Sequence, residues 1–172
     1  MSLECKEGFS YDELTKGRED ESRLGNFDGI SSLDEDIVVQ DYKDIINWYK
    51  LAAELGNAVR QSNLGVMYYR GQGITQDYKE AIKWFRLAAE QGNSEAQYNL
   101  GRIYRYGHGV AQDYKEAVKW YQLAAEQGNA EAQYNFGRMY RYGQGVEKNF
   151  DEACRLNKLA SDQGNVIAQY YS

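Results

Sequence analysis

The residues best suited to recognition chemistry are tyrosines and arginines that recur on one predicted helix face. Tyr98, Arg102 and Arg105 fall within about 60° of one another at 3.6 residues per turn, and the same three residue types return 36 positions later. An arginine guanidinium can grip a carboxylate with two hydrogen bonds, and tyrosine and arginine concentrate binding energy at interfaces. The predicted partner-binding residues, called here the Tyr/Arg face, are Tyr69, Tyr98, Arg102, Arg105, Tyr106, Tyr134, Arg138, Arg141 and Tyr142.

Two interpretations of the Tyr/Arg face remain open. In the first, it is a recognition groove for an extended peptide or tail that carries acidic groups or a C-terminal carboxylate. In the second, the arginines form a solvated helix face and the tyrosine rings partly cover the neighbouring helix. Ser62 and Val66 stand where the next repeat has Tyr98 and Arg102, so a groove would be more apolar at that end.

A catalytic site is not predicted. The single histidine, His108, lies between two turn glycines, and glutamines occupy its equivalent positions in the neighbouring repeats, so it is interpreted as a surface turn residue. Glu80, Glu116 and Glu152 are better explained as helix-capping residues than as acids or bases. No metal-ligand spacing occurs. We therefore expect neither an enzyme nor a cofactor.

The elements that must position these side chains are helices in a tandem array. Trp48, Trp84 and Trp120 stand 36 residues apart, and a fixed period of this length is typical of stacked repeat units. The chain has no proline and is rich in Ala, Leu, Gln, Glu and Lys, which predicts an all-α fold broken by glycines. A recurring glycine inside one helix of each unit, such as Gly101, indicates a neighbour too close for a Cβ atom.

Capping residues give the expected boundaries. One helix of each unit begins at Asp41 or at its equivalents 77, 113 and 149, with an acidic residue three places later, and the other follows an asparagine such as Asn57. We expect a partial leading unit with a helix at 41–55, three helix pairs at 57–92, 93–128 and 129–164, and a truncated final helix that opens at Asn165. Together they form a repeat domain over residues 37–172.

Charge separates an N-terminal arm from this domain. Residues 1–40 hold 4 Lys and Arg against 11 Asp and Glu, a net charge of −7, whereas residues 41–172 hold 16 against 15, a net charge of +1. Residues 1–36 are therefore interpreted as an acidic arm, partly disordered or degenerate, with an eroded helix near residues 22–33. A nearly neutral domain offers no basic face for nucleic acid. The arm is a conceivable tethered ligand of the arginines.

The chain offers no stretch of about 20 apolar residues, so no membrane span is expected. The N-terminus lacks the pattern of a secretory signal. A soluble, cytoplasmic protein is favoured, with a periplasmic or secreted location as the alternative if a leader has been removed.

Three repeated phrases resemble a known family. They are seen at Glu95–Tyr104, Tyr106–Val110 and Asp113–Asn129, with copies before and after, and they strongly resemble the Sel-1-like repeat, a relative of the tetratricopeptide repeat. The pattern is broken at Leu156 and Asn157, which replace the Trp-Tyr pair. The resemblance implies a right-handed α-solenoid of antiparallel helix pairs, and it implies an adaptor function without a set of catalytic residues.

The predicted function is therefore a non-catalytic scaffold that binds a protein or peptide partner on its concave face. One alternative is a structural module that self-associates end to end through residues 165–172. A less favoured alternative is a carbohydrate-binding or hydrolase-type envelope protein that uses exposed aromatic rings.

Overall fold

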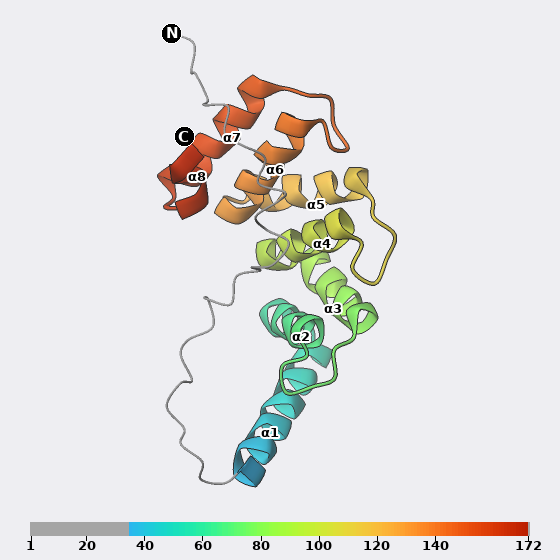
Figure 1. The fold of residues 1–172 in the computed structure, drawn as a ribbon. Helices are drawn as coiled ribbons and strands as arrows, with labels where there is room; N and C mark the ends of the chain where they lie inside the picture. The colour runs from blue at the N-terminus through green and yellow to red at the C-terminus, as the bar shows by residue number, and fades with distance from the viewer. Residues whose placement is uncertain (1–34, 172) are drawn as a thin grey trace.

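Antiparallel helix pairs stack along one direction to form the protein (Figure 1). The computed structural model describes residues 35–171. These residues form eight helices: α1 (Glu35–Glu54), α2 (Ala58–Arg70), α3 (Tyr78–Glu90), α4 (Ser94–Tyr106), α5 (Tyr114–Glu126), α6 (Ala130–Tyr142), α7 (Phe150–Asp162) and α8 (Val166–Tyr171). The all-α solenoid of antiparallel helix pairs is confirmed. The predicted arm lies outside the described residues, apart from its last two residues, which belong to α1.

Local capping fixes most helix ends where the sequence predicts them. The Asn93 side chain accepts a hydrogen bond from the Ala96 N–H at 2.8 Å, and its equivalents before α2 and α6 act in the same way. Gly107 ends α4 in the left-handed region, with φ 73°, and its N–H donates to the Ile103 carbonyl. The Asp113 side chain caps α5 through the N–H groups of Lys115 and Glu116.

Two local predictions are wrong. Helix α1 begins at Glu35 instead of Asp41, because Glu35 and Ile37 replace the two glycines that end the inner helix of later repeats. The predicted hydrogen bond from the Asp113 N–H to the Glu116 carboxylate is also replaced by other contacts. The Asp113 N–H donates to the Tyr104 carbonyl at 2.8 Å, so the Glu116 carboxylate instead pairs with Lys119 at 2.8 Å.

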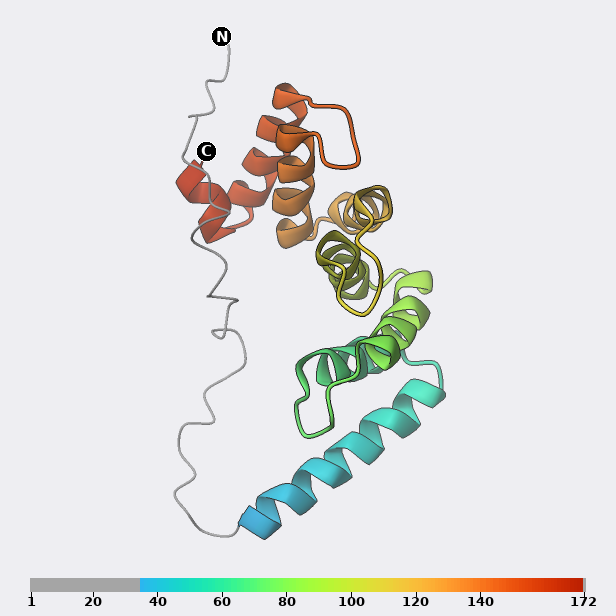
Figure 2. The same cartoon turned by 45° about the vertical axis from the view of Figure 1, so that its right-hand side comes forward.

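The first helix of each pair lies on the inner side of the stack. Helices α2, α4 and α6 pair with α3, α5 and α7 respectively, and α2 also contacts α4 while α4 contacts α6. The stack curves (Figure 2), and helices on the concave side of a curved stack lie closer together. The concave surface is therefore built by α2, α4 and α6, called here the inner helices, and α3, α5 and α7 are the outer helices.

The core lies between the two layers. The largest fully buried side chains are Leu64, Phe85, Leu100, Ile103, Tyr121 and Met139. A Cβ atom at Gly65 would lie 2.7 Å from the Phe85 ring, so the helices of a pair meet where the sequence predicts a close approach. Trp84 is 9% exposed and packs against Ala53 and Leu64, whereas Trp48 is 72% exposed because no described helix covers it.

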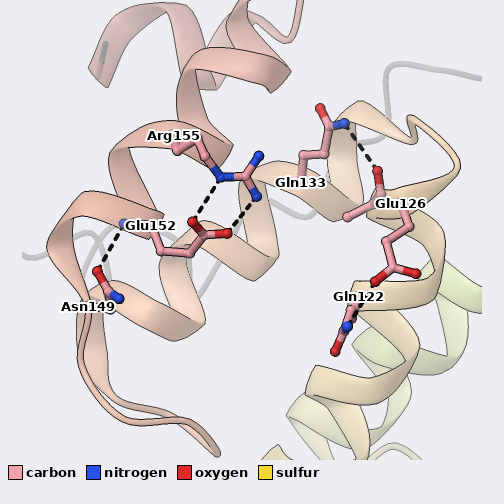
Figure 3. A network of polar contacts seen from close by, with 7 residues as sticks. Gln122, Glu126, Gln133, Asn149, Glu152 and Arg155 are labelled. Carbon is pink, nitrogen blue, oxygen red and sulfur yellow. Dashed lines mark hydrogen bonds and ion pairs between the residues drawn. The ribbon is translucent and has the colours of Figure 1, made fainter.

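A ladder of buried glutamines joins each unit to the next. The Gln133 Nε2 donates to the Ala125 carbonyl at 3.2 Å (Figure 3), and the Gln133 Oε1 accepts from the Gln163 Nε2 at 2.7 Å. Gln97 makes the same pair of bonds to Ala89 and Gln127. The repeats are therefore held together by hydrogen bonds as well as by apolar packing. Of the helices in the described residues, none is long and apolar enough to cross a membrane.

Candidate binding groove

The concave surface contains a groove of about 490 Å³ between α2 and α4. Helix α1 contributes one residue at one end of the groove and α6 contributes one at the other. The residues that line it are Tyr49, Asn63, Val66, Met67, Tyr69, Arg70, Gln72, Glu95, Tyr98, Asn99, Arg102 and Glu131. Of the predicted Tyr/Arg face, the structure therefore brings Tyr69, Tyr98 and Arg102 together.

Arg102 lies near two tyrosine rings that come from different helices. Its guanidinium carbon is 5.8 Å from the ring centre of Tyr69 on α2 and 5.8 Å from that of Tyr98 on α4. Cations are attracted to the faces of aromatic rings, so the two rings favour a position of the guanidinium between them. The geometry therefore places a cationic hydrogen-bond donor in the groove lining.

Tyr98 is half-buried beneath this arginine. Its ring lies 6.1 Å from that of Tyr121, which packs behind it from α5. Desolvation by burial raises the pKa of Tyr98 to about 12, although the nearby Arg102 charge acts in the opposite direction. The hydroxyl of Tyr98 is thus a neutral donor and acceptor at physiological pH.

Arg105 is turned away from the groove. It is 4% exposed, and its Nη1 donates to the Asn135 Oδ1 on α6 at 2.8 Å. Its guanidinium also lies 5.2 Å from the ring centre of Tyr106, which is itself 47% exposed at the edge of the concave surface. Arg105 therefore holds two inner helices together, and the structure does not place it in the groove lining.

The second copy of the Tyr/Arg face is more deeply packed than the first. Tyr134 is 7% exposed and packs against Ala160 and Ala168, and the Arg138 guanidinium lies 6.0 Å from its ring centre. Arg141 is half-buried and Tyr142 is 44% exposed at the end of α6. None of the four residues belongs to the groove lining.

The asparagines of the groove were missed by sequence reasoning. Asn63 and Asn99 are equivalent positions in consecutive repeats, so their recurrence after 36 residues could have identified them as candidates. The Asn99 Nδ2 donates to the Glu95 carbonyl at 2.9 Å, which fixes the orientation of its amide group. Such amides can bond the backbone of an extended peptide.

His108 is more enclosed than the sequence predicted. It is half-buried, and its Nδ1 shares a 2.6 Å hydrogen bond with the Tyr69 hydroxyl. Its ring is stacked with those of Tyr78 and Tyr106, at centroid distances of 5.5 and 5.7 Å. His108 thus supports the outer edge of Tyr69, whose ring faces Arg102 in the groove.

Charge is distributed unevenly between the two layers. The inner helices carry six arginines against two glutamates, a net charge of +4, whereas the outer helices carry seven Lys and Arg against seven Asp and Glu. Within the groove, Glu95 and Glu131 lie in the first turns of α4 and α6, and Arg70 and Arg102 lie toward the C-terminal ends of α2 and α4. In the part of the chain that the structure describes, no cluster of side chains suited to a metal ion occurs.

Comparison with solved structures supports the fold. A Sel1 repeat protein from Oxalobacter formigenes has 42% sequence identity and a TM-score of 0.71, over 76% of this chain and 53% of that protein. This chain thus spans about half the length of that relative. Helicobacter pylori cysteine rich protein B, at 22% identity and a TM-score of 0.62, covers 77% of this chain and 96% of that one, and it shares the fold.

The family model described as Sel1 repeat matches residues 22–57, 61–93, 94–129 and 130–165. No curated protein matches the sequence. Sel1 repeat proteins are generally protein-interaction scaffolds. The four matches cover most of the helices described above, and the chain belongs to the Sel1 repeat family.

Proposed function

We propose that this protein is a non-catalytic scaffold that binds an extended, acidic peptide segment of a protein partner in the groove between α2 and α4. The observation that carries the proposal is the Arg102 guanidinium held 5.8 Å from each of two tyrosine rings, in a groove of about 490 Å³. A guanidinium placed in this way can bind a carboxylate with two hydrogen bonds.

The charges of the groove favour one orientation of the ligand. Arg102 lies seven residues after Glu95 on α4, which corresponds to about 10 Å along the helix axis. An acidic group of the ligand would therefore lie over Arg70 and Arg102, away from Glu95. A basic group would be accepted at the opposite side.

An apolar side chain of the ligand would occupy the α2 end of the groove. Val66 and Met67 line it there, beside the Tyr49 ring from α1. Methionine adapts its shape to differently shaped apolar partners. The ligand class is thus a peptide in which an acidic residue, or a C-terminal carboxylate, lies a few residues from an apolar side chain.

Selection from a displayed random-peptide library tests the proposal. Enriched peptides should share an acidic and an apolar position, and their affinity is then measured by fluorescence polarisation. Arg102→Glu should weaken binding about 10- to 100-fold, since a hydrogen bond to a charged group contributes about 1.5–3 kcal/mol. Lys115→Glu makes the same charge change on outer helix α5 and should leave the affinity unchanged. Equal affinities of both variants would reject the groove.

End-to-end self-association through residues 165–172 is a second candidate. Val166 is 76% exposed and Ile167 is 37% exposed on α8, so this helix presents apolar side chains that the described residues do not cover. Sedimentation velocity over a wide range of protein concentration tests it. A concentration-dependent rise in mass that Val166→Lys abolishes would support self-association, and a monomer throughout would reject it.

A further inference from the structure

We propose that residues 1–21 of this chain occupy the concave groove in the absence of a partner and must leave it when a partner binds. The inference rests on the proposed function, because it assigns an intramolecular competitor to the same groove. The occupant is one segment, and its acidic run Glu19-Asp20-Glu21 lies over Arg70 and Arg102.

Charge complementarity is the first argument. Residues 1–21 contain seven Asp and Glu against three Lys and Arg, a net charge of −4. The inner helices carry a net charge of +4, whereas the outer helices are neutral. An acidic segment attached to this protein is therefore attracted to the concave surface, whereas the neutral convex surface offers it no net electrostatic attraction.

Composition beyond charge also fits the groove. The segment carries Phe9, Tyr11 and Leu14 at short distances in sequence from acidic residues. The groove offers an apolar end at Val66 and Met67 next to its arginines. The segment thus has the combination of acidic and apolar side chains that the groove accepts from an external peptide.

The place of attachment is the second argument. The first Sel1 repeat match begins at residue 22, so residues 1–21 precede the repeat that contains α1. Tyr49 of α1 lines the groove, which places that repeat at one end of the groove. The acidic run ends 14 residues before Glu35, where α1 begins, and Tyr49 lies 14 residues further along that helix. Fourteen residues of chain can extend about 46 Å, whereas fourteen residues of helix span about 21 Å. The acidic run can therefore reach back to the groove.

Tethering makes even a weak contact effective. A short flexible linker holds an attached ligand at an effective concentration in the millimolar range. A partner must then compete with the segment, and its apparent affinity falls by the fraction of molecules whose groove is open. The segment would select partners that bind the groove more tightly than it does.

NMR spectroscopy of the full, isotope-labelled chain tests the inference without any partner. Arg70→Glu combined with Arg102→Glu should shift the backbone amide signals of residues 12–21 toward random-coil positions. Lys79→Glu with Lys115→Glu makes the same charge change on the outer helices and should leave those signals in place. Raising the salt concentration from about 0.01 M to about 1 M shortens the Debye length from about 30 Å to about 3 Å and should shift wild-type signals as the inner variant does.

A variant in the segment gives the reciprocal measurement. Glu19→Gln, Asp20→Asn and Glu21→Gln together leave the repeats intact and should shift the side-chain amide signals of Asn63 and Asn99 in the groove. Signals of residues 12–21 that coincide in wild type, inner variant and outer control would overturn the inference. Peptide binding to the groove would still stand in that case, whereas a responsive segment without any selected peptide would overturn the proposed function and leave only the contact between the segment and the groove.

Discussion

A Cβ atom at Gly101 would lie 2.5 Å from the Cδ1 atom of Tyr121. Glycine inside a helix costs stability. At position 101, however, it lets α4 approach α5 until the α4 backbone contacts the Tyr121 ring. The contact recurs at Gly65, where the opposing ring is Phe85. Helix pairing in this array therefore depends on a glycine, which has no Cβ atom, at each point of close approach.

Gly101→Ala is expected to destabilise the protein. Alanine gains about 1 kcal/mol of helix propensity, but overpacking a well-filled core costs about 1–3 kcal/mol, so we expect a net loss of up to about 2 kcal/mol. Urea unfolding followed by circular dichroism measures it. In the Tyr121→Leu background the same change should cost clearly less, and an equal cost in both backgrounds would contradict the steric explanation.

Removal of a ladder glutamine should weaken the junction between repeats. Gln133→Ala removes two hydrogen bonds, one to the Ala125 carbonyl and one from the Gln163 amide, and each typically contributes about 0.5–1.5 kcal/mol. Gln122 makes only an exposed contact with Glu126 on the surface of α5 (Figure 3), so Gln122→Ala should cost no more than about 0.5 kcal/mol. Thermal and urea unfolding compare the two variants. Similar losses in the free energy of unfolding would contradict a stabilising role for the glutamine ladder.

Tyr98 should make stability depend on alkaline pH. Its folded-state pKa is raised to about 12 by burial, whereas an unfolded tyrosine titrates near 10. The neutral form is thus favoured in the folded state, so its contribution is fully present below about pH 10 and is lost as the pH rises toward about 12. Tyr98→Phe should lose less stability over that interval. An identical slope for both proteins, from urea unfolding at several pH values, would argue against a buried hydroxyl.

The Glu152–Arg155 pair on α7 should be visible in a titration. The Arg155 Nε donates to the Glu152 Oε2 at 2.8 Å and lowers the pKa of that carboxyl group. Arg155→Gln should raise the pKa of Glu152 toward its ordinary value, measured by carboxyl ¹³C NMR, whereas Lys158→Gln should not. Because the pKa is lowered in the folded state, the pair stabilises above the unfolded pKa and this small, solvent-screened contribution is lost as the pH falls.

The 36-residue period predicted the fold well because each structural device repeats with it. Caps such as Asn93, stop residues such as Gly107 and the contact at Gly101 are local in sequence, and a single repeat reveals them. The early start of α1 followed from glycines that its unit lacks.

The groove was predicted only in part. Angles around an isolated helix place Arg105 beside Arg102, but the packing of α4 against α6 buries Arg105 and directs it to Asn135. His108 was interpreted as a surface turn residue because glutamines replace it in other repeats. Its contact with Tyr69 joins two repeats, and no pattern within one repeat indicates such a contact.

A crystal structure of the full chain with a selected acidic peptide tests the central claim most directly. We predict that the peptide lies between α2 and α4, with a carboxylate within hydrogen-bond distance of the Arg102 guanidinium and an apolar side chain against Val66 or Met67. A peptide bound to outer helices α3 and α5, with the groove between α2 and α4 left without it, would contradict the account.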